Sequence, residues 1–68
     1  MNLEKKLDAA IIEYNWAEER LEDASEKLIK AAKDADYNGA ARIAEQCKRL
    51  EDDVMYYHKA VMVLTAQT

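Results

Sequence analysis

The chain contains almost no residues that interrupt a helix or crosslink a fold. Its 68 residues include one glycine, no proline and one cysteine. A single cysteine cannot form an internal disulfide, and a core from so short a chain rarely suffices without a disulfide, a metal ion or a partner chain. Because half of the residues are hydrophobic and 35% are charged, the composition argues against disorder. We therefore expect the chain to associate with itself.

Long apolar segments are also missing. The longest uninterrupted apolar run covers residues 60–64, far fewer than the ~20 residues that cross a bilayer. Because residues 1–6 include Glu4, Lys5 and Lys6, we expect no cleavable signal sequence. Without a disulfide framework, we expect a cytoplasmic protein with no membrane partner. A net charge of −4 makes a nucleic-acid partner unexpected.

Apolar and small residues recur at alternating steps of four and three residues along the whole chain. The first series is Leu3, Leu7, Ala10, Tyr14, Ala17, Leu21, Ala24, Leu28, Ala31 and Ala35, and the second is Ala40, Ile43, Cys47, Leu50, Val54, Tyr57, Val61 and Leu64. This heptad spacing predicts two long helices that share one apolar seam. The alternation of large residues with alanine in the first series favours a close approach of the helices.

A single helix-breaking cluster, Asp36-Tyr37-Asn38-Gly39, separates the two series. Asn and Gly accept a positive φ, and Asp36 can cap the helix that follows. So short a connection predicts an all-α antiparallel two-helix hairpin; the alternative is one continuous coiled coil, which the Asn-Gly pair disfavours. The expected bounds are about 2–35 for the first helix, about 36–39 for the turn and about 40–66 for the second helix, in a single domain of residues 1–68.

The sequence has more apolar residues than one seam needs, and the surplus is expected at the end away from the turn. These residues are Ile11, Ile12, Trp16, Met55, Tyr56, Met62 and Val63. A lone hairpin would expose them as a large patch, so we expect dimerisation into a four-helix bundle with two-fold symmetry. The predicted dimer interface consists of Ile12, Trp16, Met55, Tyr56, Met62 and Val63. The alternative is that the same patch binds a target.

Few residues are candidates for chemistry. His58 is the only histidine, and because Met55 stands three residues before it, the Glu-x-x-His metal motif is missing; we expect a partly buried interface residue. Cys47 lies on the seam and is expected to act as a small hydrophobe. The acidic clusters at residues 18–23 and 51–53 fit a solvated helix face better than a cation site. We therefore expect no catalytic residue, no metal, no cofactor and no enzyme.

Tyr37 is the residue that we single out for target binding. It lies in the predicted turn, where it could be an exposed aromatic anchor at the tip of a rigid rod, with Asn38 and Arg42 adding polar contacts. The alternative is that its ring packs back over the last layer of the hairpin.

Two resemblances concern architecture and ligands. The alternating leucine and alanine layers resemble the Rop class of plasmid copy-number proteins, which dimerise into four-helix bundles. Residues 50–61, Leu-Glu-Asp-Asp-Val-Met-Tyr-Tyr-His-Lys-Ala-Val, are similar to the last helix of phage hairpin proteins that sequester cyclic-nucleotide signals, although the Pro-x-Ser-Arg-Glu turn of that family is missing here. The second resemblance implies a sponge that holds a small signal molecule near Tyr56, His58 and Lys59.

A third resemblance concerns the mode of action. Small size, acidity and hairpin form resemble phage-encoded inhibitors of host regulators, including anti-quorum-sensing proteins that block a transcriptional activator. This resemblance implies an inhibitor or adaptor that binds a bacterial host protein. The alternatives are the cyclic-nucleotide sponge and a structural oligomerisation module.

Overall fold

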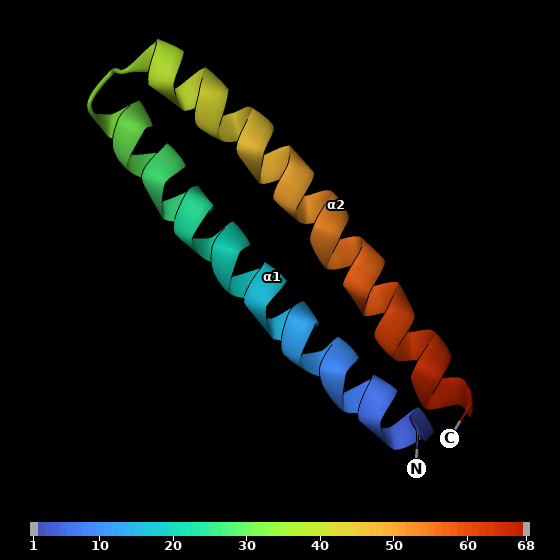
Figure 1. Cartoon of the computed structure of the whole chain (residues 1–68). Coiled ribbons are helices and arrows are strands. Elements are labelled where there is room, and N and C mark those ends of the chain that lie inside the picture. The colour runs from blue at the N-terminus through green and yellow to red at the C-terminus, as the bar shows by residue number, and fades with distance from the viewer. Residues whose placement is uncertain (1, 68) are drawn as a thin grey trace.

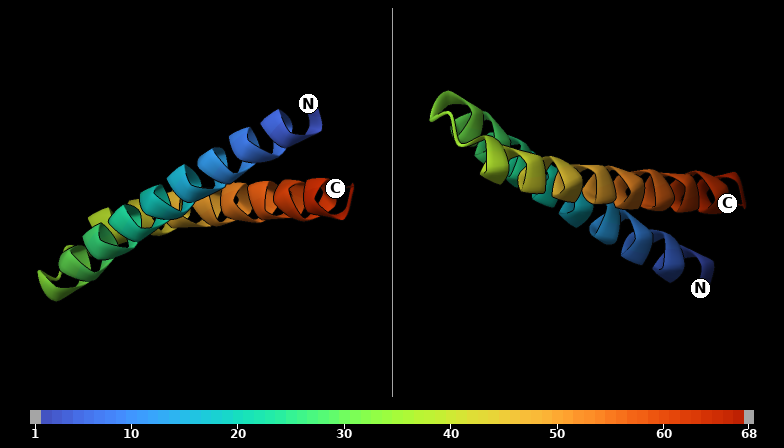
Figure 2. Two further views of the ribbon diagram at one scale, coloured as in Figure 1. Left: turned by 90° about the horizontal axis from the view of Figure 1, so that it is seen from below. Right: turned by 90° about the horizontal axis from the view of Figure 1, so that it is seen from above.

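The computed structural model describes residues 2–67 as two antiparallel helices joined by a tight turn. Helix α1 spans Asn2–Lys33 and helix α2 spans Tyr37–Gln67. They lie side by side in a rod of 51 × 13 × 12 Å, so that α1 begins and α2 ends at the end opposite the turn (Figure 1). Figure 2 shows that the helices cross and diverge toward that end. The predicted all-α hairpin is confirmed; Met1 and Thr68 of the predicted domain lie outside the described residues.

The contact between the helices follows the predicted seam. In α1 the alanines are the buried members, with Ala17 only 3% exposed, whereas the leucines and Tyr14 are half-buried. In α2 Cys47 is buried and the other members of the series are half-buried. Because alanine is small, the helix backbones approach closely and the larger side chains lie along the edges of the contact. One predicted member, Ala35, is exposed because α1 has already ended.

Helix α1 ends in a Schellman motif that is built on alanine. The N–H of Asp36 donates to the carbonyl of Ala31 at 2.9 Å, and the N–H of Ala35 donates to the carbonyl of Ala32 at 3.1 Å. Ala35 has a φ of 58°, the left-handed conformation that this motif requires and that glycine usually provides. The connection therefore occupies residues 34–36, so it begins two residues earlier and ends three residues earlier than predicted.

Helix α2 begins earlier than predicted because Asp36 caps it. The N–H of Gly39 donates to Asp36 Oδ1 at 3.0 Å, and the N–H of Ala40 donates to the Asp36 carbonyl at 2.8 Å. The expected cap is thus present, but Asn38 and Gly39 lie inside the helix without a positive φ, so their predicted role in the turn is wrong. Gly39 instead leaves room for the Asp36 carboxylate, because a Cβ at position 39 would overlap it.

The core formed by residues 2–67 is very small. Its buried residues are four alanines and Cys47, and no side chain in this part of the chain is less than 2% exposed. Nine large apolar side chains are exposed instead: Ile11, Ile12, Trp16, Ile29, Tyr37, Met55, Tyr56, Met62 and Val63. A single hairpin therefore buries little of the apolar surface that stabilises domains of this size.

Candidate interaction surfaces

The seam between the helices divides the surface of the rod into two faces. Three shallow depressions lie along one of them and are lined in part by Glu13, Trp16 and Arg20 of α1 and by Gln46, Arg49, Asp53, Tyr56, Ala60 and Val63 of α2. Residues seven apart on a helix share a face, which adds Ala9, Asp23, Lys27, Lys30 and Arg42. We call this set the Trp16 face.

The opposite face is marked by the contact of Tyr14 with His58, whose ring centroids are 5.6 Å apart. Steps of seven residues from His58 lead to Ala44 and Tyr37. By the same periodicity this His58 face comprises the apolar or small residues Ile11, Ile29, Ala32, Tyr37, Ala41, Ala44, Met55 and Met62, together with Glu4, Asp8, Glu18, Glu22, Lys48, Glu51 and His58. His58 itself is exposed, so the expectation that it is partly buried is wrong for the hairpin alone.

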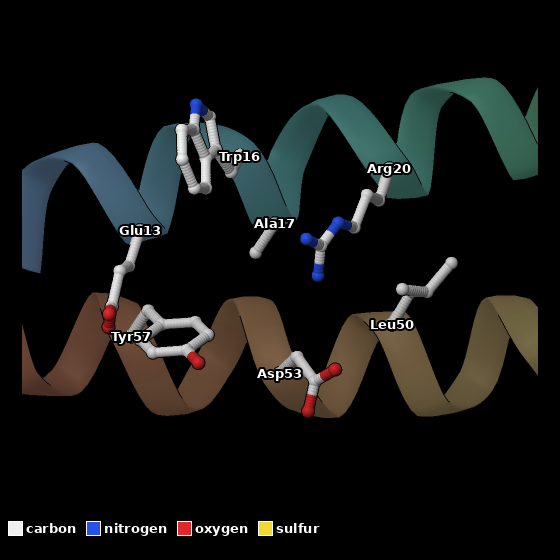
Figure 3. Close-up of a pocket in the computed structure, with 7 residues that line it drawn as sticks. All are labelled: Glu13, Trp16, Ala17, Arg20, Leu50, Asp53 and Tyr57. Atoms are coloured by element: carbon white, nitrogen blue, oxygen red, sulfur yellow. The ribbon is translucent and has the colours of Figure 1, made fainter.

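A groove of about 220 Å³ lies between the two helices at mid-length of the Trp16 face. Trp16 lies at its rim and is 58% exposed. In Figure 3 Arg20 extends from α1 toward α2, while Asp53 and Tyr57 line the groove from α2. The groove therefore combines an exposed indole with charges of both signs.

A second depression, of about 400 Å³, lies on α2 nearer the end away from the turn. It is lined by Tyr56, Lys59, Ala60, Val63 and Leu64. The Tyr56 ring packs edge-to-face on the ring of Tyr57, with centroids 5.3 Å apart. This contact makes the aromatic surface continuous from the groove to the second depression.

All six predicted interface residues are exposed, but the structure divides them between faces. Trp16, Tyr56 and Val63 lie on the Trp16 face, whereas Met55 and Met62 lie on the His58 face. Ile12 is one turn before Trp16, on the outer side of α1. The prediction grouped these residues by their distance from the turn and did not separate the two sides of each helix.

The turn end is more apolar than predicted. Tyr37 is 76% exposed at the start of α2, so its ring does not pack back over the hairpin. Ile29, 55% exposed, lies on the same face, together with Ala32 and Ala41. We call these four residues the turn-end patch. The prediction that the surplus apolar residues lie only at the end away from the turn is wrong. The sequence did contain the relevant information, because Ile29 and Ala32 are not members of the heptad series and therefore lie outside the seam.

The three predicted target-binding residues do not form one surface. Asn38 and Arg42 are exposed and one helical turn apart, so they are neighbours. Tyr37 and Arg42 are five residues apart, which separates them by about 140° around the helix axis. Tyr37 therefore belongs to the His58 face and Arg42 to the Trp16 face.

One titratable group on the seam is perturbed. Desolvation, followed by a hydrogen bond and charge repulsion from Glu18, raises the pKa of Tyr14 above the usual tyrosine value. Each of these effects disfavours the phenolate. Tyr14 therefore stays neutral at physiological pH.

The possible metal ligands of residues 2–67 are dispersed: no three His, Cys, Asp or Glu side chains are grouped so that they could hold a metal ion. Neither α1 nor α2 has a stretch long and apolar enough to cross a membrane. Comparison with known protein families, curated proteins and solved structures found nothing that matches this chain.

Proposed function

We propose that this chain is a non-catalytic protein-binding module that pairs with a second copy to form a four-helix bundle. The observation that carries the proposal is the imbalance of apolar burial in residues 2–67. Nine large apolar side chains are exposed, while the buried set contains only alanines and one cysteine. A second chain that covers part of this surface supplies the burial that a single hairpin lacks.

The dimensions of the rod suit a dimer of hairpins. One face of 51 × 13 Å projects roughly 660 Å², and standard interfaces bury about 800 Å² per partner. Side chains make the surface area of the face larger than its projection, so a face that is covered along its whole length can bury about 800 Å². Contact at one end of the rod buries less than that area. The dimer that we propose therefore overlaps along the full length of both hairpins.

The turn-end patch is the surface that we propose for the target. Tyr37 and Ile29 are large and exposed, and Ala32 and Ala41 beside them leave room for side chains of a partner. Tyrosine is enriched at binding hot spots, and a patch on two packed helices loses little entropy on binding. The target class is a protein, for which a bacterial transcriptional regulator in the cytoplasm, bound by a phage-encoded inhibitor, is the first candidate.

The dimer is tested by sedimentation equilibrium together with thermal unfolding at several protein concentrations. We expect a mass of two chains and a Tm that rises with concentration, because association stabilises the folded state by mass action. A mass of one chain and a constant Tm at micromolar to millimolar concentrations would overturn the proposed dimer.

The target surface is tested with the Tyr37→Ala and Ile29→Ala variants in affinity capture from a bacterial lysate, followed by binding to the purified captured regulator. We expect each variant to lose at least about tenfold in affinity while remaining dimeric. Lys33→Ala, an exposed change at the same end of α1, is the matched control. Unchanged binding by both variants contradicts the assignment of the turn-end patch.

The depression at Tyr56 and Lys59 supports a second candidate, the cyclic-nucleotide sponge. An aromatic ring and an ammonium group could hold a base and a phosphate, although His58 lies on the other face. Thermal unfolding with and without cyclic nucleotides separates the two functions. We expect no shift; a rise in Tm that is lost in Lys59→Ala favours the sponge over the protein-binding module.

A further inference from the structure

We infer that the two hairpins pair in parallel through their Trp16 faces, with α1 of each copy on α2 of the other and both turns at the same end. This inference rests on the proposed dimer and adds its face, its direction and the placement of the two turn-end patches.

The contact between Tyr14 and His58 fixes which residues lie at the same level of the rod. Because the helices are antiparallel, a residue that follows Tyr14 by a given number of positions lies at the same level as the residue that precedes His58 by the same number. A two-fold axis parallel to the rod keeps these levels, so it brings each α1 residue beside the level α2 residue of the second copy. The pairs between copies can thus be derived from one hairpin.

The pairs at the end away from the turn are apolar. Trp16 is level with Tyr56, and both are exposed on the Trp16 face. One heptad farther from the turn, Ala9 is level with Val63. Parallel pairing therefore buries the exposed indole against an aromatic ring twice per dimer, and such aromatic contacts dominate interface energetics.

The pairs toward the turn carry complementary charges. Asp23 of one copy is level with Arg49 of the other, and Arg20 lies near the level of Asp53. Each pair occurs twice because of the symmetry. Lys30 and Arg42 form a pair of like charge, but they lie at the exposed end of the rod, where solvent screens them. The balance of charges favours this alignment and fixes its direction.

The other arrangements are less complementary. Antiparallel pairing lays the apolar half of each hairpin, with Tyr56 and Val63, on the charged turn half of the other. Pairing through the His58 faces brings acidic residues together, since Glu22 lies near the level of Glu51. Among its lysine, arginine, aspartate and glutamate residues, that face has one basic residue, Lys48. Its five acidic residues are Glu4, Asp8, Glu18, Glu22 and Glu51. Like charges opposed along an interface suppress association.

Parallel pairing has a consequence for target binding. It covers the Trp16 faces and leaves both His58 faces outside, so Tyr37 and Ile29 of each copy remain accessible. Both turn-end patches then lie at one end of the bundle.

Pulsed dipolar spectroscopy tests the direction of pairing. Spin labels are attached in Cys47→Ala chains that carry Lys33→Cys at the turn end or Lys5→Cys at the other end; both lysines are exposed. Parallel pairing predicts distances of about 20–35 Å for each labelled dimer, the width of a four-helix bundle with its labels. Antiparallel pairing places both label pairs about one rod length, 51 Å, apart.

The two outcomes separate the inference from the proposed function. Distances near the rod length in a chain of dimeric mass overturn parallel pairing and leave the dimer standing. A monomeric mass overturns the proposed dimer and the inference with it.

Reversing the charges of Asp23 and Arg49 tests whether the hairpins pair through the Trp16 face. We expect Asp23→Arg and Arg49→Asp each to raise the dimer Kd about tenfold, because each creates two like-charged contacts, and the double variant to restore it. Glu22→Arg, the neighbouring acidic position on the His58 face, is the matched control and should not weaken the dimer. Single reversals without effect, or a double variant weaker than either single one, would overturn pairing through the Trp16 face.

Discussion

At the residue scale, Ala35 holds a backbone conformation that is unfavourable for alanine. Its φ of 58° costs a residue with a Cβ about 1 kcal/mol relative to glycine. We therefore expect Ala35→Gly to raise the free energy of unfolding by about 0.5–1 kcal/mol, measured by urea unfolding at fixed protein concentration. The matched control is Ala44→Gly at an exposed helical position of α2, which should lower it by about the same amount. A loss of stability in Ala35→Gly contradicts the Schellman geometry.

Tyr14 gives a residue-scale prediction for the pH dependence of stability. Because desolvation and Glu18 raise its pKa, the folded state retains the phenolic proton at a pH where the unfolded chain has lost it. This stabilising effect is complete below the ordinary tyrosine pKa and is lost as pH rises through the folded value. Glu18→Gln should lower the Tyr14 midpoint without fully restoring it, since desolvation remains.

The measurement is a titration of ¹³C-labelled tyrosine by NMR, which separates the four tyrosines of the chain. Glu19→Gln is the control, because Glu19 points to another side of α1 and should leave the Tyr14 midpoint unchanged. If Glu18→Gln also leaves it unchanged, the coupling between Tyr14 and Glu18 is wrong.

At the scale of the helices, the start of α2 depends on two residues that share one space. Asp36 caps the helix through the N–H of Gly39, and a Cβ at Gly39 would displace its carboxylate. Gly39→Ala therefore gains about 1 kcal/mol of helix propensity and loses about 1 kcal/mol of capping, so we expect a net change near zero.

The same substitution should behave differently when the cap is already absent. In an Asp36→Ala chain, Gly39→Ala should raise the free energy of unfolding by about 1 kcal/mol, so that a double-mutant cycle yields a coupling of that size. Urea unfolding of the four chains measures it. Additive effects would show that Gly39 does not make room for the cap.

At the scale of the whole molecule, the two faces should differ in their contribution to the dimer. Trp16 and Met55 are comparably exposed but lie on opposite faces. We expect Trp16→Glu to raise the dimer Kd at least about a hundredfold, because it removes an aromatic contact and buries a charge twice. Met55→Glu should change the Kd less than about threefold.

Sedimentation equilibrium measures both constants, and because Trp16 is the only tryptophan, its fluorescence reports the burial of the indole directly. A dimer that tolerates Trp16→Glu and is broken by Met55→Glu uses the His58 face instead.

Several features of this protein were determined by the sequence alone. The heptad series placed Ala17, Leu21, Cys47 and Leu50 correctly on the seam, and the break near Asp36 correctly implied a hairpin. These inferences succeed because helical periodicity is local: each step depends only on residues within two turns. The exposure of Trp16 and Tyr56 followed from the same pattern.

Only the tertiary structure decided which exposed residues share a surface. The sequence grouped Met55 with Trp16 and Arg42 with Tyr37, and in both cases the structure places the two residues on different faces. The structure also places the left-handed residue at Ala35 and not at Asn38 or Gly39, because the cap at Asp36 starts α2 earlier than its composition suggests. A face of a hairpin is defined by the register and rotation of two helices against each other, and that information resides in their contact and not in either segment alone.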